Sequence, residues 1–182
     1  MGRRLTLILG GARSGKSRYA QEAATRCGGR VLYVATAAVL DDEMAARIVA
    51  HKRERPHDWE LLEKTSRVGP AVAEFLKHRA IDVVIVDCLT LLASNVLLAL
   101  PEPLDPGHAA SALDAEVAEL LGVWEGGSAH WLIISNEVGM GIVPPYPLGR
   151  AYRDVLGRVN QRLAAAAEEV IFLVAGLPMK LK

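Results

Sequence analysis

The feature that most constrains this chain lies near its start, where eight residues, Gly10 to Ser17, read GGARSGKS. They match G-x-x-x-x-G-K-[ST], a pattern in which glycines let successive backbone N–H groups converge on a phosphate chain. An apolar run, Leu5 to Leu9, leads into the pattern, and a helix-compatible segment, Arg18 to Arg26, follows it. A phosphate-binding loop requires this strand–loop–helix context. The sequence therefore predicts that the chain binds a nucleoside triphosphate.

Every residue of this segment, called the phosphate loop below, is a candidate nucleotide contact: Gly10, Gly11, Ala12, Arg13, Ser14, Gly15, Lys16 and Ser17. Lys16 is expected to reach the β- and γ-phosphates, and the Ser17 hydroxyl to hold Mg²⁺. The helix that follows adds free N–H groups and the positive end of its dipole. The alternative is a glycine-rich turn with a chance lysine, which the flanking strand and helix make the weaker interpretation.

Composition limits the class of protein and its partners. A chain of 182 residues is long enough for one domain, 1–182, with a substantial core. Its formal net charge is zero, so no overall field attracts nucleic acid or a membrane surface. Cys27 and Cys88, without a recognisable secretory signal, are expected to be free thiols. The longest apolar stretch, Cys88 to Leu100, is interrupted by polar residues. We therefore expect a soluble, cytoplasmic protein with no nucleic-acid partner and no membrane insertion.

Extended and helical patterns alternate along the whole chain, which predicts an α/β fold with a mostly parallel central sheet and helices on both faces. The expected strands are 5–9, 31–36, 59–63, 82–87, 131–135, 170–175 and an edge strand, 177–181. The expected helices are 16–26, 41–55, 70–79, 89–100, 111–126 and 148–169. The fifth helix is placed from Ser111 and Asp114, which resemble a capping box, after a loop marked by Pro101, Pro103 and Pro106.

Polar residues follow several of these predicted strands. Ligands in open parallel sheets collect at the carboxyl ends of the strands, where this chain has Thr36, Asp87 and Ser135-Asn136-Glu137. Asp87 ends an apolar strand, a position from which a carboxylate can hold phosphate-bound Mg²⁺. Since Mg²⁺ keeps most of its waters, Ser17 and Asp87 would suffice as protein ligands. The alternative for Asp87 is a helix N-cap before Leu89.

Two further segments are candidates for chemistry. In the second predicted helix, Arg47 and His51 lie four residues apart and share a face, with more basic residues following. Neighbouring cations disfavour protonation of an imidazole, and the neutral form is the nucleophile; the alternative is a solvated surface histidine. The long segment Asn136–Pro144 begins where a strand ends and contains two glycines, which is typical of a binding element or lid; the alternative is a simple connection.

Taken together, the chain resembles the bifunctional adenosylcobinamide kinase / adenosylcobinamide-phosphate guanylyltransferase family of cobalamin biosynthesis. The matching stretches are GGARSGKS (Gly10–Ser17), YVATA (Tyr33–Ala37), DDEMAARI (Asp41–Ile48) before His51-Lys52, Arg55-Pro56 with Trp59, NEVGMGIVP (Asn136–Pro144) and GRVNQRLAAAAEEV (Gly157–Val170). They cover nearly the full chain. The first stretch alone is only a phosphate loop, whereas the last two, in this order, are far more specific.

The resemblance implies a RecA-like P-loop NTPase domain and two reactions. The first phosphorylates adenosylcobinamide with a nucleoside triphosphate, ATP or GTP. The second transfers GMP from GTP, through a guanylyl-histidine, to adenosylcobinamide phosphate, giving adenosylcobinamide-GDP. By resemblance the nucleophile falls on His51, and Lys16 is catalytic. The implied nucleotide contacts beyond the phosphate loop are Ala35, Thr36, Ala37, Lys52, Arg53, Glu54, Arg55, Glu63 and Asp87. The resemblance also implies a homotrimer.

Two other functions remain open at the level of sequence. The chain could be an ordinary small-molecule kinase, which would transfer only the γ-phosphate and form no covalent intermediate. It could also be a RecA-like nucleotide-switch ATPase that regulates partner binding, although the zero net charge and the lack of a basic stripe argue against a nucleic-acid motor.

Overall fold

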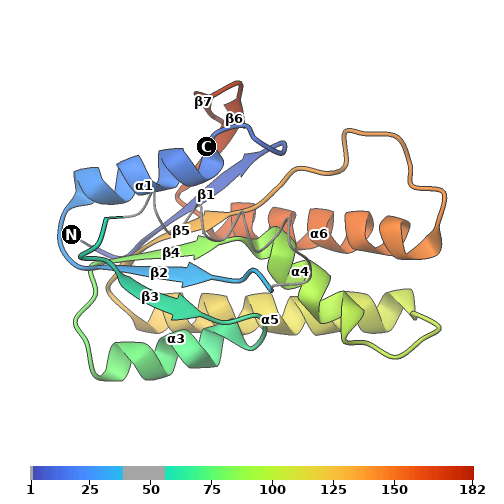
Figure 1. The fold of residues 1–182 in the computed structure, drawn as a ribbon, viewed down its shortest axis with the longest axis horizontal. Coiled ribbons are helices and arrows are strands. Elements are labelled where there is room, and N and C mark those ends of the chain that lie inside the picture. Colours follow the sequence, from blue (N-terminus) through green and yellow to red (C-terminus); the bar gives the residue numbers. More distant parts are fainter. Residues whose placement is uncertain (1, 39–55) are drawn as a thin grey trace.

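The computed structural model describes residues 2–38 and 56–182, and these form a seven-stranded sheet flanked by helices (Figure 1). The strand order is β3-β2-β4-β5-β1-β6-β7. All neighbouring strands pair in parallel except β6 and β7, which form an antiparallel hairpin at one edge. The α/β fold and the mostly parallel sheet are therefore as the sequence predicts.

The described strands are β1 (Arg4–Gly10), β2 (Val31–Ala35), β3 (Glu60–Glu63), β4 (Val83–Asp87), β5 (His130–Ile134), β6 (Glu169–Val174) and β7 (Leu177–Lys180). The described helices are α1 (Lys16–Cys27), α3 (Val68–Lys77), α4 (Leu89–Leu98), α5 (Pro106–Gly126) and α6 (Pro147–Ala166). The predicted helix 41–55 lies outside the described residues.

The side chains of each central strand alternate between two hydrophobic cores, one on each face of the sheet. On one face, Leu7 of β1 and Trp131 of β5 pack with residues of α3, α4, α5 and α6. On the other face, Ile8 and Leu132 pack with Ala20 and the rest of the inner side of α1. Figure 1 shows the same division for α1, which lies above the central strands in that view, and for α3 and α5, which lie below them. Near-continuous apolar strands are thus explained by burial on both faces.

The start of α5 corrects one prediction. The helix begins at Pro106, not at Ser111, and the Asp105 carboxylate caps it by accepting a hydrogen bond from the His108 N–H at 2.6 Å. Pro106 occupies the first helical position, where its missing N–H costs nothing and its fixed φ suits a helix. Ser111 lies inside the helix and donates its hydroxyl to the Gly107 carbonyl at 3.0 Å, so its apparent capping box with Asp114 is not used.

The end of α6 also differs from prediction, because the helix stops at Ala166 and Glu169 begins β6. Glu169 pairs in register with Thr6 of β1, and its carboxylate lies 3.4 Å from Arg4 and 3.1 Å from Lys180. Tertiary pairing with β1 therefore places the last residue of the predicted helix, Glu169, in a strand.

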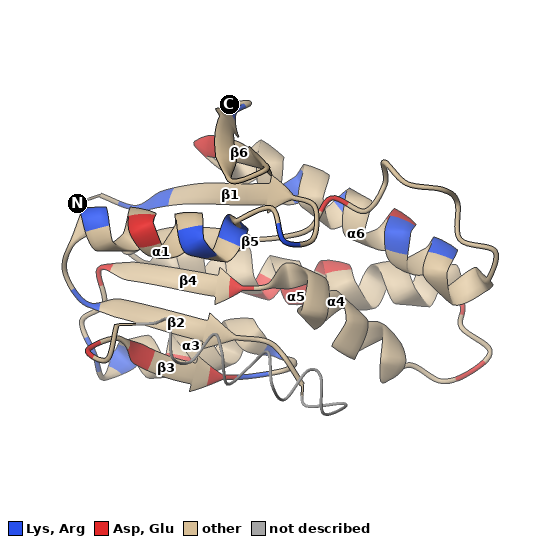
Figure 2. Ribbon diagram, turned by 45° about the horizontal axis from the view of Figure 1, so that its top comes forward, with Lys and Arg blue, Asp and Glu red and all other residues tan. Residues whose placement is uncertain are grey.

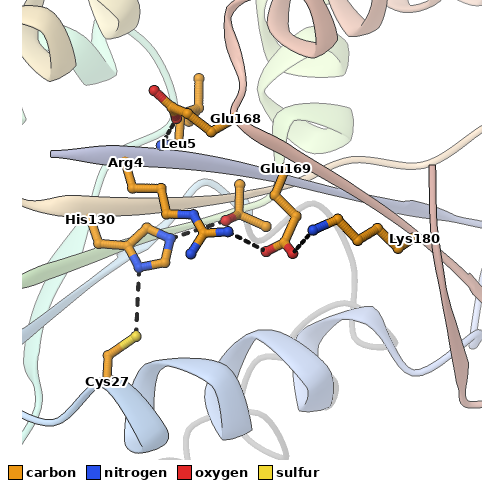
Figure 3. Close-up of polar contacts among 8 residues, drawn as sticks. Arg4, Leu5, Cys27, His130, Glu168, Glu169 and Lys180 are labelled. Atoms are coloured by element: carbon orange, nitrogen blue, oxygen red, sulfur yellow. Dashed lines mark hydrogen bonds and ion pairs between the residues drawn. The ribbon is translucent and has the colours of Figure 1, made fainter. Parts of the chain in front are cut away.

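Polar contacts at the amino edge of the sheet, shown in Figure 3, join β1, β5, β6 and α1 on the side opposite the phosphate loop. A ring nitrogen of the buried His130, Nε2, lies 3.0 Å from Thr6 Oγ1, and Nδ1 lies 3.5 Å from Cys27 Sγ. Burial is the main cause that lowers the pKa of His130, and the nearby Arg4 adds to it.

Cys27 and Cys88 are both free thiols, as expected. No helix in the described part of the chain is long and apolar enough to span a membrane.

Candidate nucleotide-binding active site

Parallel pairing brings the predicted polar residues together at the carboxyl ends of the strands, because parallel strands all end on the same side of the sheet. This end of the sheet is called the site edge below. Asp87 stands opposite Ala35 in the β2–β4 pair, and Ala35 stands opposite Glu63 in the β2–β3 pair. The phosphate loop follows β1 at the same edge. Figure 2 shows acidic residues at the carboxyl ends of β3 and β4. The structure thus assembles one site from segments far apart in sequence.

The backbone of the phosphate loop has the conformation that its glycines predict. Gly10 has φ 149° and Gly15, which precedes α1, has φ 96°. A Cβ at Gly10 would lie 2.5 Å from the Leu173 carbonyl oxygen of β6, so only glycine fits this position. Arg13 also has positive φ, 56°, at the exposed turn of the loop.

Lys16 lies under the phosphate loop with its ammonium group directed back onto it. The side chain is 8% exposed, and Nζ donates to the Gly11 carbonyl at 2.6 Å. Burial lowers the pKa of Lys16, while the nearby Cys88 and Asp87 oppose that shift. The same burial effect raises the pKa of the Cys88 thiol to about 12, so this cysteine stays neutral. A buried cation at the N-terminus of α1 suits a polyphosphate ligand, whose charge would compensate its desolvation.

Asp87 is not the cap of the helix that follows it. The N-cap of α4 is Cys88, without a side-chain cap, so the alternative interpretation of Asp87 is wrong. Its Oδ2 accepts a hydrogen bond from the Tyr33 hydroxyl at 2.6 Å, and the other carboxylate oxygen accepts none from the described residues. The Ser17 hydroxyl likewise has no hydrogen bond within the described part of the chain. A carboxylate and a hydroxyl are hard oxygen donors of the kind that Mg²⁺ takes, so the residues fit that metal.

Thr36 locks the ends of β2 and β4 together. Its buried hydroxyl donates to the Cys88 carbonyl at 2.6 Å and accepts from the Cys88 N–H at 2.8 Å. The Thr36 carbonyl in turn accepts from the Asn95 amide at 2.8 Å. Because the Thr36 hydroxyl makes both of these hydrogen bonds, it holds the carboxyl end of β2, with Ala35 and Ala37, beside the carboxyl end of β4, with Asp87.

Two backbone contacts hold the phosphate loop from opposite sides. The Glu137 N–H, just after β5, donates to the Gly10 carbonyl at 3.2 Å, and the Gly176 N–H donates to the Ser14 carbonyl at 3.0 Å. Gly176 belongs to the turn between β6 and β7 and has φ 80°. The Ser14 Oγ is buried and has no hydrogen-bond partner among the described residues. Such an orphaned hydroxyl inside the loop is a ready contact for a phosphate oxygen.

The structure therefore brings together the following predicted site residues: Gly10, Gly11, Ala12, Arg13, Ser14, Gly15, Lys16, Ser17, Ala35, Thr36, Ala37, Glu63 and Asp87. The other predicted residues, His51, Lys52, Arg53, Glu54 and Arg55, lie outside the described residues.

Several residues that shape this site were not selected from the sequence. Tyr33 carries the one hydroxyl in an otherwise apolar strand, a signal that could have indicated a polar partner. Thr90 and Asn160 both contact Asn136 and come from two different helices. Their sequence neighbourhoods are apolar or alanine-rich, so nothing local indicated this contact.

The chain matches the family described as "cobinamide kinase / cobinamide phosphate guanyltransferase" over residues 6–181. The chain belongs to this family. It is 43% identical to the bifunctional adenosylcobalamin biosynthesis protein CobU of Salmonella typhimurium, with 98% of this chain and 99% of that protein covered. It is 40% identical to CobU of Escherichia coli, with the same coverage. It is 42% identical to the bifunctional adenosylcobalamin biosynthesis protein CobP of Pseudomonas aeruginosa, with 97% and 96% covered.

Family membership confirms the resemblance drawn from the sequence, and with it the P-loop NTPase class and a bifunctional kinase and guanylyltransferase of cobalamin biosynthesis. Nucleotides and cobinamide are the substrates that this family implies. The ordinary small-molecule kinase and the nucleotide-switch ATPase are thereby set aside. The two specific stretches, Asn136–Pro144 and Gly157–Val170, contact each other through the bond from Asn160 Nδ2 to the Asn136 carbonyl, and the first stretch contacts the phosphate loop through the Glu137 N–H and the Gly10 carbonyl.

Proposed function

We propose that this chain phosphorylates adenosylcobinamide and then transfers GMP from GTP to the product, working as one P-loop nucleotide-binding domain. The convergence of the phosphate loop, Lys16 and Asp87 at one sheet edge carries this proposal. In the kinase step, backbone N–H groups and Lys16 would hold the β- and γ-phosphates while the substrate hydroxyl attacks the γ-phosphorus. Mg²⁺, held by Ser17 and Asp87, would neutralise phosphate charge.

The second step uses a different phosphorus atom. We propose that an imidazole nitrogen of His51 attacks the α-phosphorus of GTP, so that a P–N bond forms and pyrophosphate leaves. The phosphate of adenosylcobinamide phosphate then attacks the same phosphorus, takes the GMP and restores the imidazole. Lys52, Arg53, Glu54, Arg55 and Glu63, together with Ala35, Thr36 and Ala37, are proposed nucleotide contacts in this reaction. Support comes from the family match and from the position of Glu63 beside Ala35 at the site edge.

We further propose a cytoplasmic homotrimer, which rests on the family resemblance rather than on contacts within one chain. Sedimentation equilibrium of the purified protein measures this directly. A mass of three chains is expected, and a monomer at all concentrations would contradict it.

The covalent step is tested by incubating the protein with Mg²⁺ and GTP that is radioactively labelled at its α-phosphate. The wild type should acquire a label that is labile to acid and stable to alkali, as a phosphoramidate is. The variant His51→Ala should acquire none, yet it should still phosphorylate adenosylcobinamide, because the phosphate loop is intact. A matched control is His57→Ala, which changes another histidine of the same region and should label like the wild type.

Mass spectrometry of the corrinoid products separates the two reactions. With ATP alone, the product should gain one phosphate; with GTP, it should be adenosylcobinamide-GDP. Equal labelling of wild type and His51→Ala would refute the guanylyl-histidine, and loss of both activities in a folded His51→Ala would refute the proposed division of roles.

A further inference from the structure

The peptide that follows β5 is held by three separate parts of the fold. The Asn136 N–H donates to Thr90 Oγ1 of α4 at 2.8 Å, and the Asn136 carbonyl accepts from Asn160 Nδ2 of α6 at 3.1 Å. The next residue, Glu137, donates its N–H to the Gly10 carbonyl at 3.2 Å. One short segment therefore connects two helices to the first residue of the phosphate loop.

The two side chains that hold this segment are buried polar groups. Thr90 is 7% exposed and Asn160 is 5% exposed. The helices that carry them are also joined directly, because the Tyr152 hydroxyl of α6 donates to the Thr90 carbonyl of α4 at 3.1 Å. Side chains fixed by burial and by such bonds hold their targets at a defined position.

The side chain of Asn160 is not the one that would stabilise the fold best at its position. Its Oδ1 is buried and has no hydrogen-bond partner among the described residues. Burying an unpaired carboxamide oxygen costs free energy, and an apolar side chain of similar size would avoid this cost. The remaining contribution of the residue is the bond from Nδ2 to Asn136, which fixes the segment against the phosphate loop.

The segment that begins at Asn136 is also attached to α6 at its far end, near Pro144. The contacts described here therefore hold its two ends and not its middle. Arg150 Nη1 donates to the carbonyls of Pro144 and Pro145 at 3.1 and 2.7 Å. Between these anchors, Met140 and Ile142 are exposed. The start of the loop, which contacts Gly10, is accordingly the part whose position bears on phosphoryl transfer.

We propose that Thr90 and Asn160 are positioning residues that set the phosphate loop in its reactive geometry through Asn136 and Glu137. This proposal rests on the proposed kinase and guanylyltransferase function. Small displacements of groups that align a transferring phosphate reduce the rate of the chemical step far more than they reduce nucleotide binding. Loss of either bond should therefore lower kcat and leave KM for the nucleotide nearly unchanged.

The test compares Thr90→Val, Asn160→Leu, the double variant and wild type, with Thr90→Ser as the matched control that keeps the hydroxyl. For Thr90→Val and Asn160→Leu we expect kcat of the kinase reaction to fall about tenfold, with KM for ATP within about twofold. Thr90→Ser should keep near wild-type kcat. Because both side chains hold one residue, the double variant should lose less than the product of the single losses.

Thermal unfolding of the same variants distinguishes positioning from general stability. The Tm of Asn160→Leu should change little, because removal of the unpaired buried oxygen offsets the loss of the donor to the Asn136 carbonyl. Unchanged kcat in both single variants would overturn the proposal, as would a loss of kcat in proportion to a lowered Tm, or equal losses in Thr90→Ser and Thr90→Val. A wild type that phosphorylates no cobinamide would instead refute the proposed function, so the two failures are distinguishable.

Discussion

Replacing Gly10 with alanine perturbs the phosphate loop at its most constrained position. Gly10 is the last residue of β1, has φ 149°, and pairs in register with Leu173 of β6. An added Cβ would lie 2.5 Å from the Leu173 carbonyl oxygen and 2.7 Å from Ser14 Oγ. The serine side chain can rotate away, but the carbonyl belongs to the sheet and can move only if the β1–β6 pairing is disturbed.

Two costs add in Gly10→Ala. A non-glycine residue in this part of φ/ψ space costs about 1–3 kcal/mol. Forcing an extra carbon into a packed position costs about 1–3 kcal/mol more. The sum, about 2–6 kcal/mol, corresponds to a decrease of about 4–24 °C in Tm, since about 1 kcal/mol shifts Tm by about 2–4 °C at this chain length. The displaced Gly10 carbonyl should also weaken nucleotide binding, because Glu137 and the rest of the loop are positioned by it.

Urea unfolding followed by tryptophan fluorescence measures the free energy of unfolding, and nucleotide titration measures the affinity. The matched control is Gly11→Ala, one residue further along. An added Cβ at Gly11 meets no atom within 4 Å, and its φ is not in the left-handed region. Its free energy of unfolding should change by no more than about 0.5 kcal/mol.

Equal stability of Gly10→Ala and Gly11→Ala would refute the reasoning, because it would mean that neither the strain at Gly10 nor the contact with Leu173 limits the loop. A large loss in stability without any loss of nucleotide affinity would refute the second part, the dependence of the loop on the Gly10 carbonyl.

Three further predictions follow from single contacts. Tyr33→Phe removes the hydroxyl that donates to Asp87 at 2.6 Å, and kinase kcat should fall about tenfold in steady-state assays while the fold is kept. Glu116→Gln replaces the buried carboxylate that accepts from the backbone N–H groups of Arg67 and Val68, at the start of α3, at 2.6 and 3.3 Å. Urea unfolding should show a free energy of unfolding lower by about 1–2 kcal/mol. Burial lowers the pKa of His130 below its ordinary 6.5, so unfolding takes up a proton as pH falls through that value and stability declines. Urea midpoints at about pH 7.5 and about pH 5.5 should therefore differ more in wild type than in His130→Asn; an equal difference contradicts this.

The amino-acid sequence was sufficient wherever structure follows from near neighbours. The phosphate loop is such a case, because glycine spacing and flanking hydrophobicity within about twenty residues dictate strand, loop and helix. Asp87 is another, since an acid that ends an apolar strand must stand at the carboxyl edge of a parallel sheet. The same local reasoning placed the strands close to their observed ends, but it failed at Ser111, because the helix begins five residues earlier, where Asp105 caps it and Pro106 takes the first helical position.

The support of the site was decided only by tertiary structure. Tyr33 meets Asp87 across two strands, Gly176 meets the phosphate loop from the last hairpin, and Thr90 and Asn160 reach Asn136 from two helices. Hydrogen bonds between residues this far apart in sequence leave no periodic signal, because each depends on strand order and helix packing rather than on spacing. The sequence by itself therefore predicted which residues meet the phosphates, whereas only the folded chain decided which residues hold those candidates in place.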